Sequence, residues 1–128
     1  MVVLGTGSPI PDAYRAGASI AVIYQGKAYL FDVGAGSIRR AVEARYKYDI
    51  AALYPIHIDT VFITHMHSDH VLDLSELSQT MWWRRPNSLR AYGPTGLKEM
   101  ATHIEKMLAE PAKPKDLIIG CNEGGQTI

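Results

Sequence analysis

Three histidines and an aspartate fall within six residues, directly after an apolar stretch. The sequence reads His65-Met66-His67-Ser68-Asp69-His70 and follows the apolar residues 58–63. In extended backbone, side chains two residues apart point to the same side, so His65 and His67 can converge on one ion. Asp69 and His70 come where the chain is expected to turn into a helix, and they can face a second ion nearby. The pattern therefore predicts a strand, a tight turn and a helix start at one place.

The residue types in this run are those that hold catalytic metal ions. Imidazole and carboxylate together suit zinc, iron or manganese, and three protein ligands with an open position are the usual catalytic arrangement. Sites of open α/β sheets lie at strand-to-helix turns of this kind. A polar loop with chance histidines is the alternative, but three of the chain's five histidines are in this run. The run is therefore interpreted as a metal site.

The rest of the chain alternates between strand-like and helix-like patterns, which indicates an α/β fold. The expected strands are residues 1–4, 18–24, 28–32, 58–64, 89–92 and 117–119, and the expected helices are residues 37–46, 73–83 and 95–108. Glycines and prolines predict a loop over residues 5–17. Gln25-Gly26-Lys27 predicts a hairpin turn, and Ser37 is expected to cap the helix that it begins.

Two glycine-rich segments upstream complete a family pattern. They are Leu4-Gly5-Thr6-Gly7-Ser8-Pro9 and Phe31-Asp32-Val33-Gly34-Ala35-Gly36. Together with His-x-His-x-Asp-His, they resemble the metallo-β-lactamase superfamily, and within it the ribonuclease Z, phosphodiesterase-like and arylsulfatase-like branch. The resemblance implies a hydrolase in which two metal ions, first of all zinc, activate a hydroxide. It also implies that His65 and His67 hold the first ion and that Asp69 and His70 hold the second. Asp69 would in addition orient the attacking water.

Two departures from the ribonuclease Z pattern leave the substrate open. Those enzymes usually carry Gly-Glu-Gly-Thr where this chain has Gly34-Ala35-Gly36-Ser37, and glycine where Ser68 stands. Phosphodiester hydrolysis, with RNA or a small-molecule ester as the substrate, is the first interpretation. Arylsulfatase or lactonase activity is the second. A non-catalytic, metal-binding and self-associating half-domain is the third. No substrate-binding residue is identified.

The 128-residue chain is shorter than superfamily members usually are. They usually pack two similar β/α halves sheet to sheet in a four-layer αββα sandwich, and the second half supplies further ligands. Residues 1–128 are therefore expected to be a partial domain, the N-terminal half of that sandwich. Its uncovered inner sheet face is expected to carry Val22, Leu30, Val61 and Ile63, and to make the chain a homo-oligomer.

The composition limits the location and the partners. Thirteen basic and thirteen acidic residues balance, so the net charge does not by itself favour nucleic acid. No apolar run approaches the ~20 residues of a membrane span, so no membrane partner is expected. The single cysteine, Cys121, has no partner for an intrachain disulfide. That fits a reducing compartment, and a cytoplasmic protein is expected.

Several other residues have two interpretations each. Asp32 either accepts a hydrogen bond from a ligand imidazole or forms a turn, and the resemblance favours the first. His57 and His103 are expected at the surface rather than in the site. Trp82-Trp83-Arg84-Arg85 is expected to pack and to complement a helix end, with nucleic-acid contact as the alternative. The loop over residues 5–17 either lines the site or only connects strands.

Overall fold

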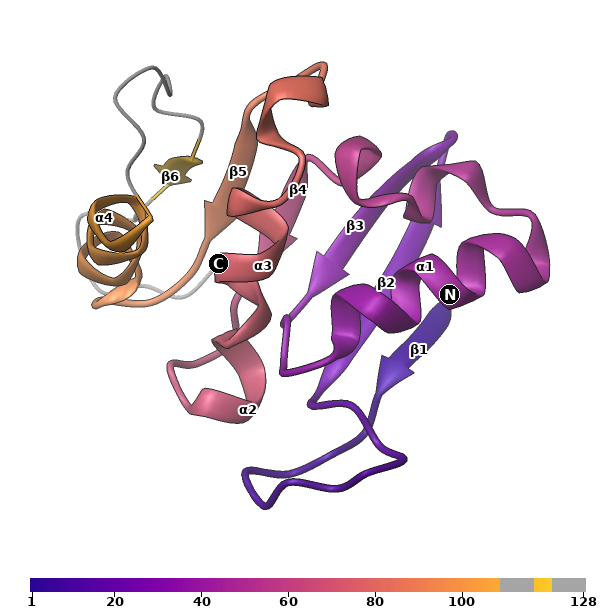
Figure 1. The fold of residues 1–128 in the computed structure, drawn as a ribbon, viewed down its shortest axis with the longest axis horizontal. Coiled ribbons are helices and arrows are strands. Elements are labelled where there is room, and N and C mark those ends of the chain that lie inside the picture. The colour runs from indigo at the N-terminus through magenta and orange to yellow at the C-terminus, as the bar shows by residue number, and fades with distance from the viewer. Residues whose placement is uncertain (109–116, 121–128) are drawn as a thin grey trace.

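The computed structural model describes residues 1–108 and 117–120 (Figure 1). The strands are β1 (Val2–Gly5), β2 (Ser19–Tyr24), β3 (Lys27–Phe31), β4 (Thr60–Phe62), β5 (Leu89–Tyr92) and β6 (Leu117–Gly120). The α-helices are α1 (Ser37–Tyr48), α2 (Ser68–Val71), α3 (Asp73–Gln79) and α4 (Leu97–Met107), and the 3-10 helices are η1 (Ala51–Leu53), η2 (Pro55–His57) and η3 (Trp82–Arg84). In the described part of the chain, no helix is long and apolar enough to cross a membrane.

The six strands form one mixed sheet in chain order. β1, β2 and β3 pair antiparallel, whereas β3, β4, β5 and β6 pair parallel. Gln25 and Gly26 both have positive φ, 47° and 75°, as a tight two-residue hairpin between right-twisted strands requires. The expected hairpin and the expected α/β class are thus both confirmed. Parallel pairing brings the carboxyl ends of β3, β4 and β5 to one edge of the sheet.

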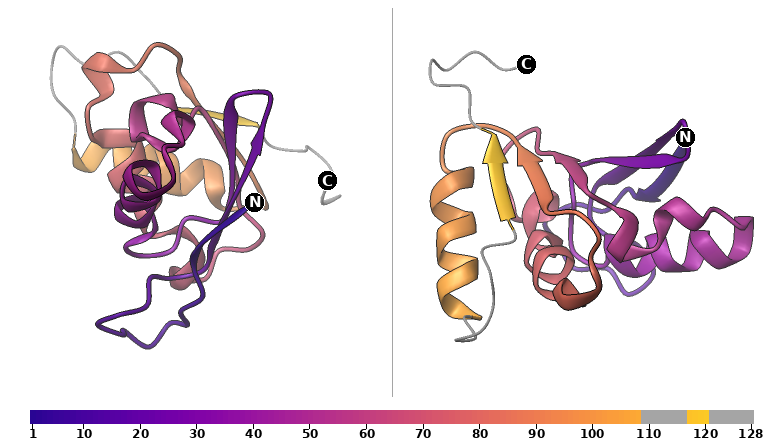
Figure 2. Two further views of the ribbon diagram at one scale, coloured as in Figure 1. Left: turned by 90° about the vertical axis from the view of Figure 1, so that its right-hand side faces the viewer. Right: turned by 90° about the horizontal axis from the view of Figure 1, so that it is seen from above.

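The helices α1, α3 and α4 lie on one side of the sheet (Figure 2). Beneath them, Ala21, Leu30, Val61 and Ala91 are completely buried, one from each of β2 to β5. These four residues pair across neighbouring strands, so they form one continuous row. They belong to one hydrophobic core, which also includes Leu53, Leu74 and Leu77. The described chain therefore supplies one sheet and one helical layer.

The opposite face of the sheet is lined by larger side chains. The rings of Phe31, Phe62 and Tyr92 stack across β3, β4 and β5, with centroids 5.1 and 5.4 Å apart. Phe31 is 39% exposed and Ile20 is 38% exposed. We call Ile20, Phe31, Phe62 and Tyr92 the open face, because no described helix covers it.

The expected composition of the uncovered face was largely wrong. Leu30, Val61 and Ile63 are buried under the helices, and of the four expected residues only Val22 lies on the same side of the sheet as the open face. A strand of nearly continuous apolar residues does not itself reveal which of its two sides the helices cover. An uncovered apolar face does exist, but aromatic residues form it.

α1 and α4 match their expected ranges to within two residues, whereas two other expectations about the helices are wrong. α3 ends at Gln79 instead of residue 83, because Thr80 is extended and Met81 is left-handed at φ 55°. Ser37 does not cap α1, which begins after left-handed Gly36 and has no side-chain cap from its own N-cap residue. Ser37 is instead fully buried. A carboxylate from another helix takes over the capping, as described below.

Candidate metal centre

Asp32 and the histidines meet at the carboxyl edge of the parallel strands. Asp32 directly follows β3, and residues 64–70, here called the histidine loop, follow β4 and run into α2 (Figure 1). Phe31 pairs with Phe62 in the parallel register, and the amide of Asp32 donates to the carbonyl of Phe62 at 2.8 Å. Neighbouring strand ends thus place side chains from two distant parts of the sequence together, as the edge of a parallel sheet does in other α/β proteins.

Three imidazoles gather in the histidine loop. The ring of His65 lies 4.7 Å from that of His67 and 4.0 Å from that of His70, measured between centroids. His65 and His67 are exposed, whereas the side chain of His70 is 18% exposed. His67 is in extended conformation just before α2, and Asp69 and His70 are within that helix. The predicted turn from strand to helix is therefore present.

Asp32 is the hub of the hydrogen bonds beneath these rings. Its Oδ1 accepts from the Thr64 amide at 2.7 Å, and its Oδ2 accepts from the Thr64 hydroxyl at 2.8 Å. The same Oδ2 is 2.7 Å from Nδ1 of His70. A carboxylate only accepts, so this contact assigns the proton of His70 to Nδ1 and leaves Nε2 as the free lone pair. Such a contact fixes the tautomer and orientation that a metal-binding imidazole needs.

Thr64 extends this network to a second histidine. Its hydroxyl oxygen is 3.0 Å from Nδ1 of His65. The single hydroxyl proton is used toward Asp32, so the oxygen accepts from Nδ1–H of His65. Nε2 of His65 is then also the free lone pair. One buried carboxylate thereby sets the tautomers of two histidines, directly for His70 and through Thr64 for His65.

Asp69 is a buried carboxylate with an unused oxygen. The residue is 9% exposed, and its Oδ2 lies 3.4 Å from Nε2 of His70. Its Oδ1 is buried and has no hydrogen-bond partner in the described structure. A buried carboxylate oxygen without a donor is unfavourable unless a cation or a water satisfies it. This oxygen and the free imidazole nitrogens are the donor types that zinc prefers.

The donors are gathered but do not form a closed cage. Within residues 1–108 and 117–120, no group of three or more His, Cys, Asp or Glu side chains has the geometry of a formed metal site. The residue types and the unpaired Asp69 oxygen fit a metal ion, whereas the present rotamers do not enclose one.

The glycine-rich loop reaches the site at its last residue. A Cβ on Gly17 would lie 2.8 Å from the carbonyl oxygen of Asp69, which is closer than side-chain atoms approach. The amide of Gly17 donates to Ala35, and Gly7 donates to Ala16, so the base of the loop is tied down. Only glycine at position 17 allows this approach of the two backbones. Gly17 therefore packs against the backbone of the helix that carries Asp69, while residues 8–15 are exposed.

Two residues of the site region escaped the sequence reasoning. Thr64 reads as the end of an apolar strand, and nothing in its context indicates the link between Asp32 and His65. Asp73 is 6% exposed at the start of α3, where it reads as an ordinary helix-start aspartate. Its carboxylate instead bonds to the start of α1.

The residues that the sequence places outside the site do lie away from it. His57 is exposed in η2, at the amino end of β4, and Nδ1 of the exposed His103 bonds to the carbonyl of Glu99 within α4. The cluster around η3 is at the amino end of β5, opposite the histidine loop (Figure 1). There, Arg85 donates to the carbonyls of Ile58 and Leu77 at 2.6 Å each, so it complements the end of α3 as expected. The expected packing of both tryptophans is wrong for Trp83, which is 67% exposed.

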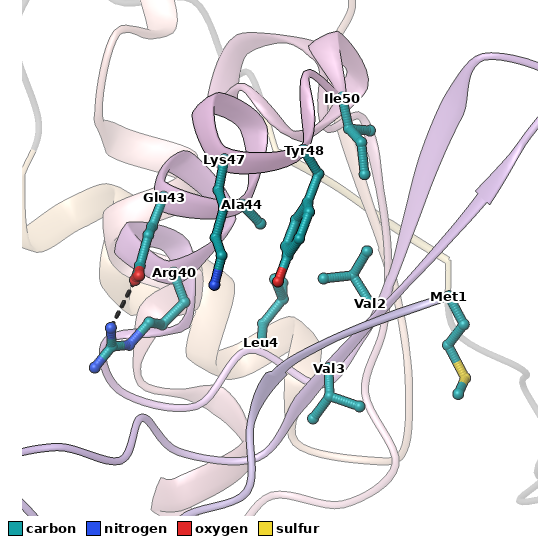
Figure 3. A pocket seen from close by; sticks show the side chains of 10 residues that line it. All are labelled: Met1, Val2, Val3, Leu4, Arg40, Glu43, Ala44, Lys47, Tyr48 and Ile50. Atoms are coloured by element: carbon teal, nitrogen blue, oxygen red, sulfur yellow. Dashed lines mark hydrogen bonds and ion pairs between the residues drawn. The ribbon is translucent and has the colours of Figure 1, made fainter.

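A groove of about 620 Å³ opens between β1 and α1 (Figure 3). Its apolar lining includes Val2, Leu4 and Ile50. Lys47 and Tyr48 extend from α1 toward β1, beside an Arg40–Glu43 ion pair of 2.6 Å. None of the residues of the histidine loop lines this groove. It is therefore separate from the candidate centre.

The model of the metallo-β-lactamase superfamily matches residues 14–119. The chain belongs to this superfamily. Among the curated relatives of this chain, ribonuclease Z of Pyrococcus horikoshii is 43% identical to it over 109 residues. This match covers 84% of this chain and 32% of the relative. Ribonuclease Z of Thermococcus onnurineus is 41% identical over 95 residues, covering 73% of this chain and 28% of the relative. The chain thus spans about a third of the length of these relatives. The names of these relatives describe hydrolytic enzymes, which agrees with the hydrolase expected from this sequence.

Solved structures of the superfamily show the same fold. The short form of human tRNase Z superposes with a TM-score of 0.72 at 24% identity, covering 94% of this chain and 44% of that one. The metallo-β-lactamase fold protein YhfI of Bacillus subtilis gives 0.69 at 17% identity, covering 97% and 45%. The expected class, the N-terminal part of a metallo-β-lactamase fold, is confirmed.

Proposed function

We propose that this chain is the metal-binding part of a hydrolase that cleaves phosphodiester bonds in RNA. The observation that carries the proposal is the convergence of three imidazoles and an unpaired, buried Asp69 oxygen at the carboxyl edge of β3 and β4. Relatives named ribonuclease Z, more than 40% identical, favour RNA over other phosphodiesters. An RNA substrate also agrees with the cytoplasmic location expected from the composition.

His65 and His67 would hold a first divalent ion. Zinc is the first candidate for it, and iron and manganese are the others. Asp69 and His70 would contribute to a second. Bound metal supplies Lewis-acid polarisation of the phosphoryl group and activation of water at neutral pH. Asp32 holds Nδ1 of His70 and, through Thr64, orients His65. Asp69 Oδ1, which has no hydrogen-bond partner in the described structure, would be the oxygen that turns to the ion or to its water.

Hydrolysis assays would separate the candidate functions. A transfer-RNA precursor, bis(p-nitrophenyl) phosphate, p-nitrophenyl sulfate and a lactone would each be incubated with the protein and zinc. Cleavage of the first two, lost in His67→Ala and kept in the surface control His103→Ala, is the expected outcome. Preferential sulfate-ester or lactone hydrolysis would favour the alternative that Ala35 and Ser68 leave open. Zinc binding with no turnover of any substrate would favour a non-catalytic half-domain.

A further inference from the structure

Asp73 joins two helices through one buried carboxylate. It begins α3, but its Oδ1 accepts from the Gly36 amide at 3.0 Å and its Oδ2 accepts from the Ile38 amide at 2.9 Å. The Ser37 hydroxyl is a further donor at 3.4 Å. Gly36 to Ile38 form the start of α1, which has no side-chain cap of its own. The carboxylate therefore caps α1 from another helix, where the amides and the helix dipole favour a negative charge.

The backbone of residues 70–73 is bound to Val33, which lies in the turn after β3. The Asp73 amide donates to the Val33 carbonyl at 2.9 Å, and the Val33 amide donates to the His70 carbonyl at 2.8 Å. Val33 directly follows Asp32, whose φ of 60° is unusual for a residue other than glycine. Residues 70–73 are thus held to Val33 at both ends, and to α1 through the Asp73 side chain.

These bonds link the turn after β3, the end of α2 and the starts of α1 and α3 beside the candidate centre. His70 takes part in two of these contacts. Its Nδ1 is 2.7 Å from Oδ2 of Asp32, and its carbonyl accepts from the Val33 amide. The Asp73 side chain restrains the other end of the turn of residues 33–36, because it binds the Gly36 amide to the start of α3. Any shift of α3 relative to α1 would move His70 and Asp69 relative to Asp32.

We infer that Asp73 is a positioning residue, which sets His70 and Asp69 against Asp32 through the start of α1 and the backbone of Val33. The inference rests on the proposed metal-binding role of the histidine loop. Asp73 itself touches neither the imidazoles nor a reacting group. Its effect is on the geometry of the donors before an ion arrives, and it should therefore appear in metal affinity and in local backbone protection.

Two variants of Asp73 test this inference in the 128-residue chain. Asp73→Ala removes both acceptor oxygens, whereas Asp73→Asn keeps one and should retain part of the effect. Ile58→Val is the control, because Ile58 is completely buried but precedes β4, at the end opposite the histidine loop. Zinc affinity is measured by competition with a chromophoric chelator on samples whose circular dichroism shows that they are folded. Hydrogen exchange of the Val33 amide is followed in parallel, without metal.

The expected result is a zinc affinity about 10-fold weaker in Asp73→Ala, an intermediate affinity in Asp73→Asn and a parental affinity in Ile58→Val. The Val33 amide should exchange faster in both Asp73 variants. Parental zinc affinity in the folded Asp73 variants, or unchanged protection of Val33, would overturn the inference. A parent chain that binds no zinc would contradict the proposed function instead, while the exchange of Val33 would still decide whether Asp73 organises this turn.

Discussion

The carbonyl oxygen of Asp69 lies against the backbone of Gly34, so that a Cβ on Gly34 would be 2.0 Å from it. The same Cβ would be 2.7 Å from the amide nitrogen of Ala18. Three segments therefore meet at one point: the end of the early loop, the turn after β3 and the helix that carries Asp69 and His70. The glycine-rich segments and the histidine loop, which are far apart in sequence, are parts of one packed unit.

Gly34→Ala should break this unit. Backbone atoms crowd the new methyl group and cannot rotate away, so we expect the free energy of unfolding to fall by about 3 kcal/mol or more. Gly26→Ala is the control, since its φ is 75° but no atom lies within 4 Å of the added Cβ. Backbone strain alone should cost it about 1–2 kcal/mol. Urea denaturation measures both, and equal losses would contradict the packing argument.

Asp32→Asn should weaken zinc binding about 10- to 100-fold while leaving the fold intact. An amide has one acceptor oxygen and presents N–H groups, so it cannot accept from both Thr64 and His70 as the carboxylate does. The matched control is Asp59→Asn, another buried aspartate, at the opposite end of β4. Isothermal titration with zinc compares them. Parental affinity in Asp32→Asn would indicate that Asp32 only forms the turn.

The open face should make the 128-residue polypeptide self-associate. Phe31, Phe62 and Tyr92 form a stacked apolar surface that no described helix covers, and such surfaces favour association. Sedimentation velocity at rising concentration is expected to show species above 14.1 kDa. Phe62→Ser should reduce them, whereas Trp83→Ser, an exposed aromatic at the far end of β5, should not. A monomer at every concentration would refute the expectation of a homo-oligomer.

The strand-and-helix order was predictable because local signals agreed with the final packing. Gly26, the proline and glycine residues of the early loop and the apolar runs marked their elements within a few residues. The clustering of His65, His67, Asp69 and His70 was equally local, since all four lie in one turn. The contact of Asp32 with a ligand imidazole was implied by the family resemblance, and it agrees with the rule that the ends of parallel strands share an edge.

The rest depended on contacts between distant segments. Nothing in the sequence indicates that the Asp73 side chain caps α1 rather than its own helix, because both positions suit an aspartate at a helix start. The covered side of the sheet was also unpredictable, since Leu30 and Phe31 are both apolar and only helix packing decides which one is buried. Thr64 acquired its role from hydrogen bonds to Asp32 and His65 that exist only once the loop is folded.

Zinc stoichiometry of a double variant tests the central claim most directly. His65→Ala combined with His67→Ala removes two of the three gathered imidazoles but leaves the Asp32–His70 contact in place. The control is His57→Ala combined with His103→Ala, which removes two surface histidines. After equilibrium dialysis against excess zinc, elemental analysis should find less bound zinc in the first double variant and the parental amount in the second. Parental zinc content in the chain lacking His65 and His67 would contradict the assignment of the histidine loop as a metal centre.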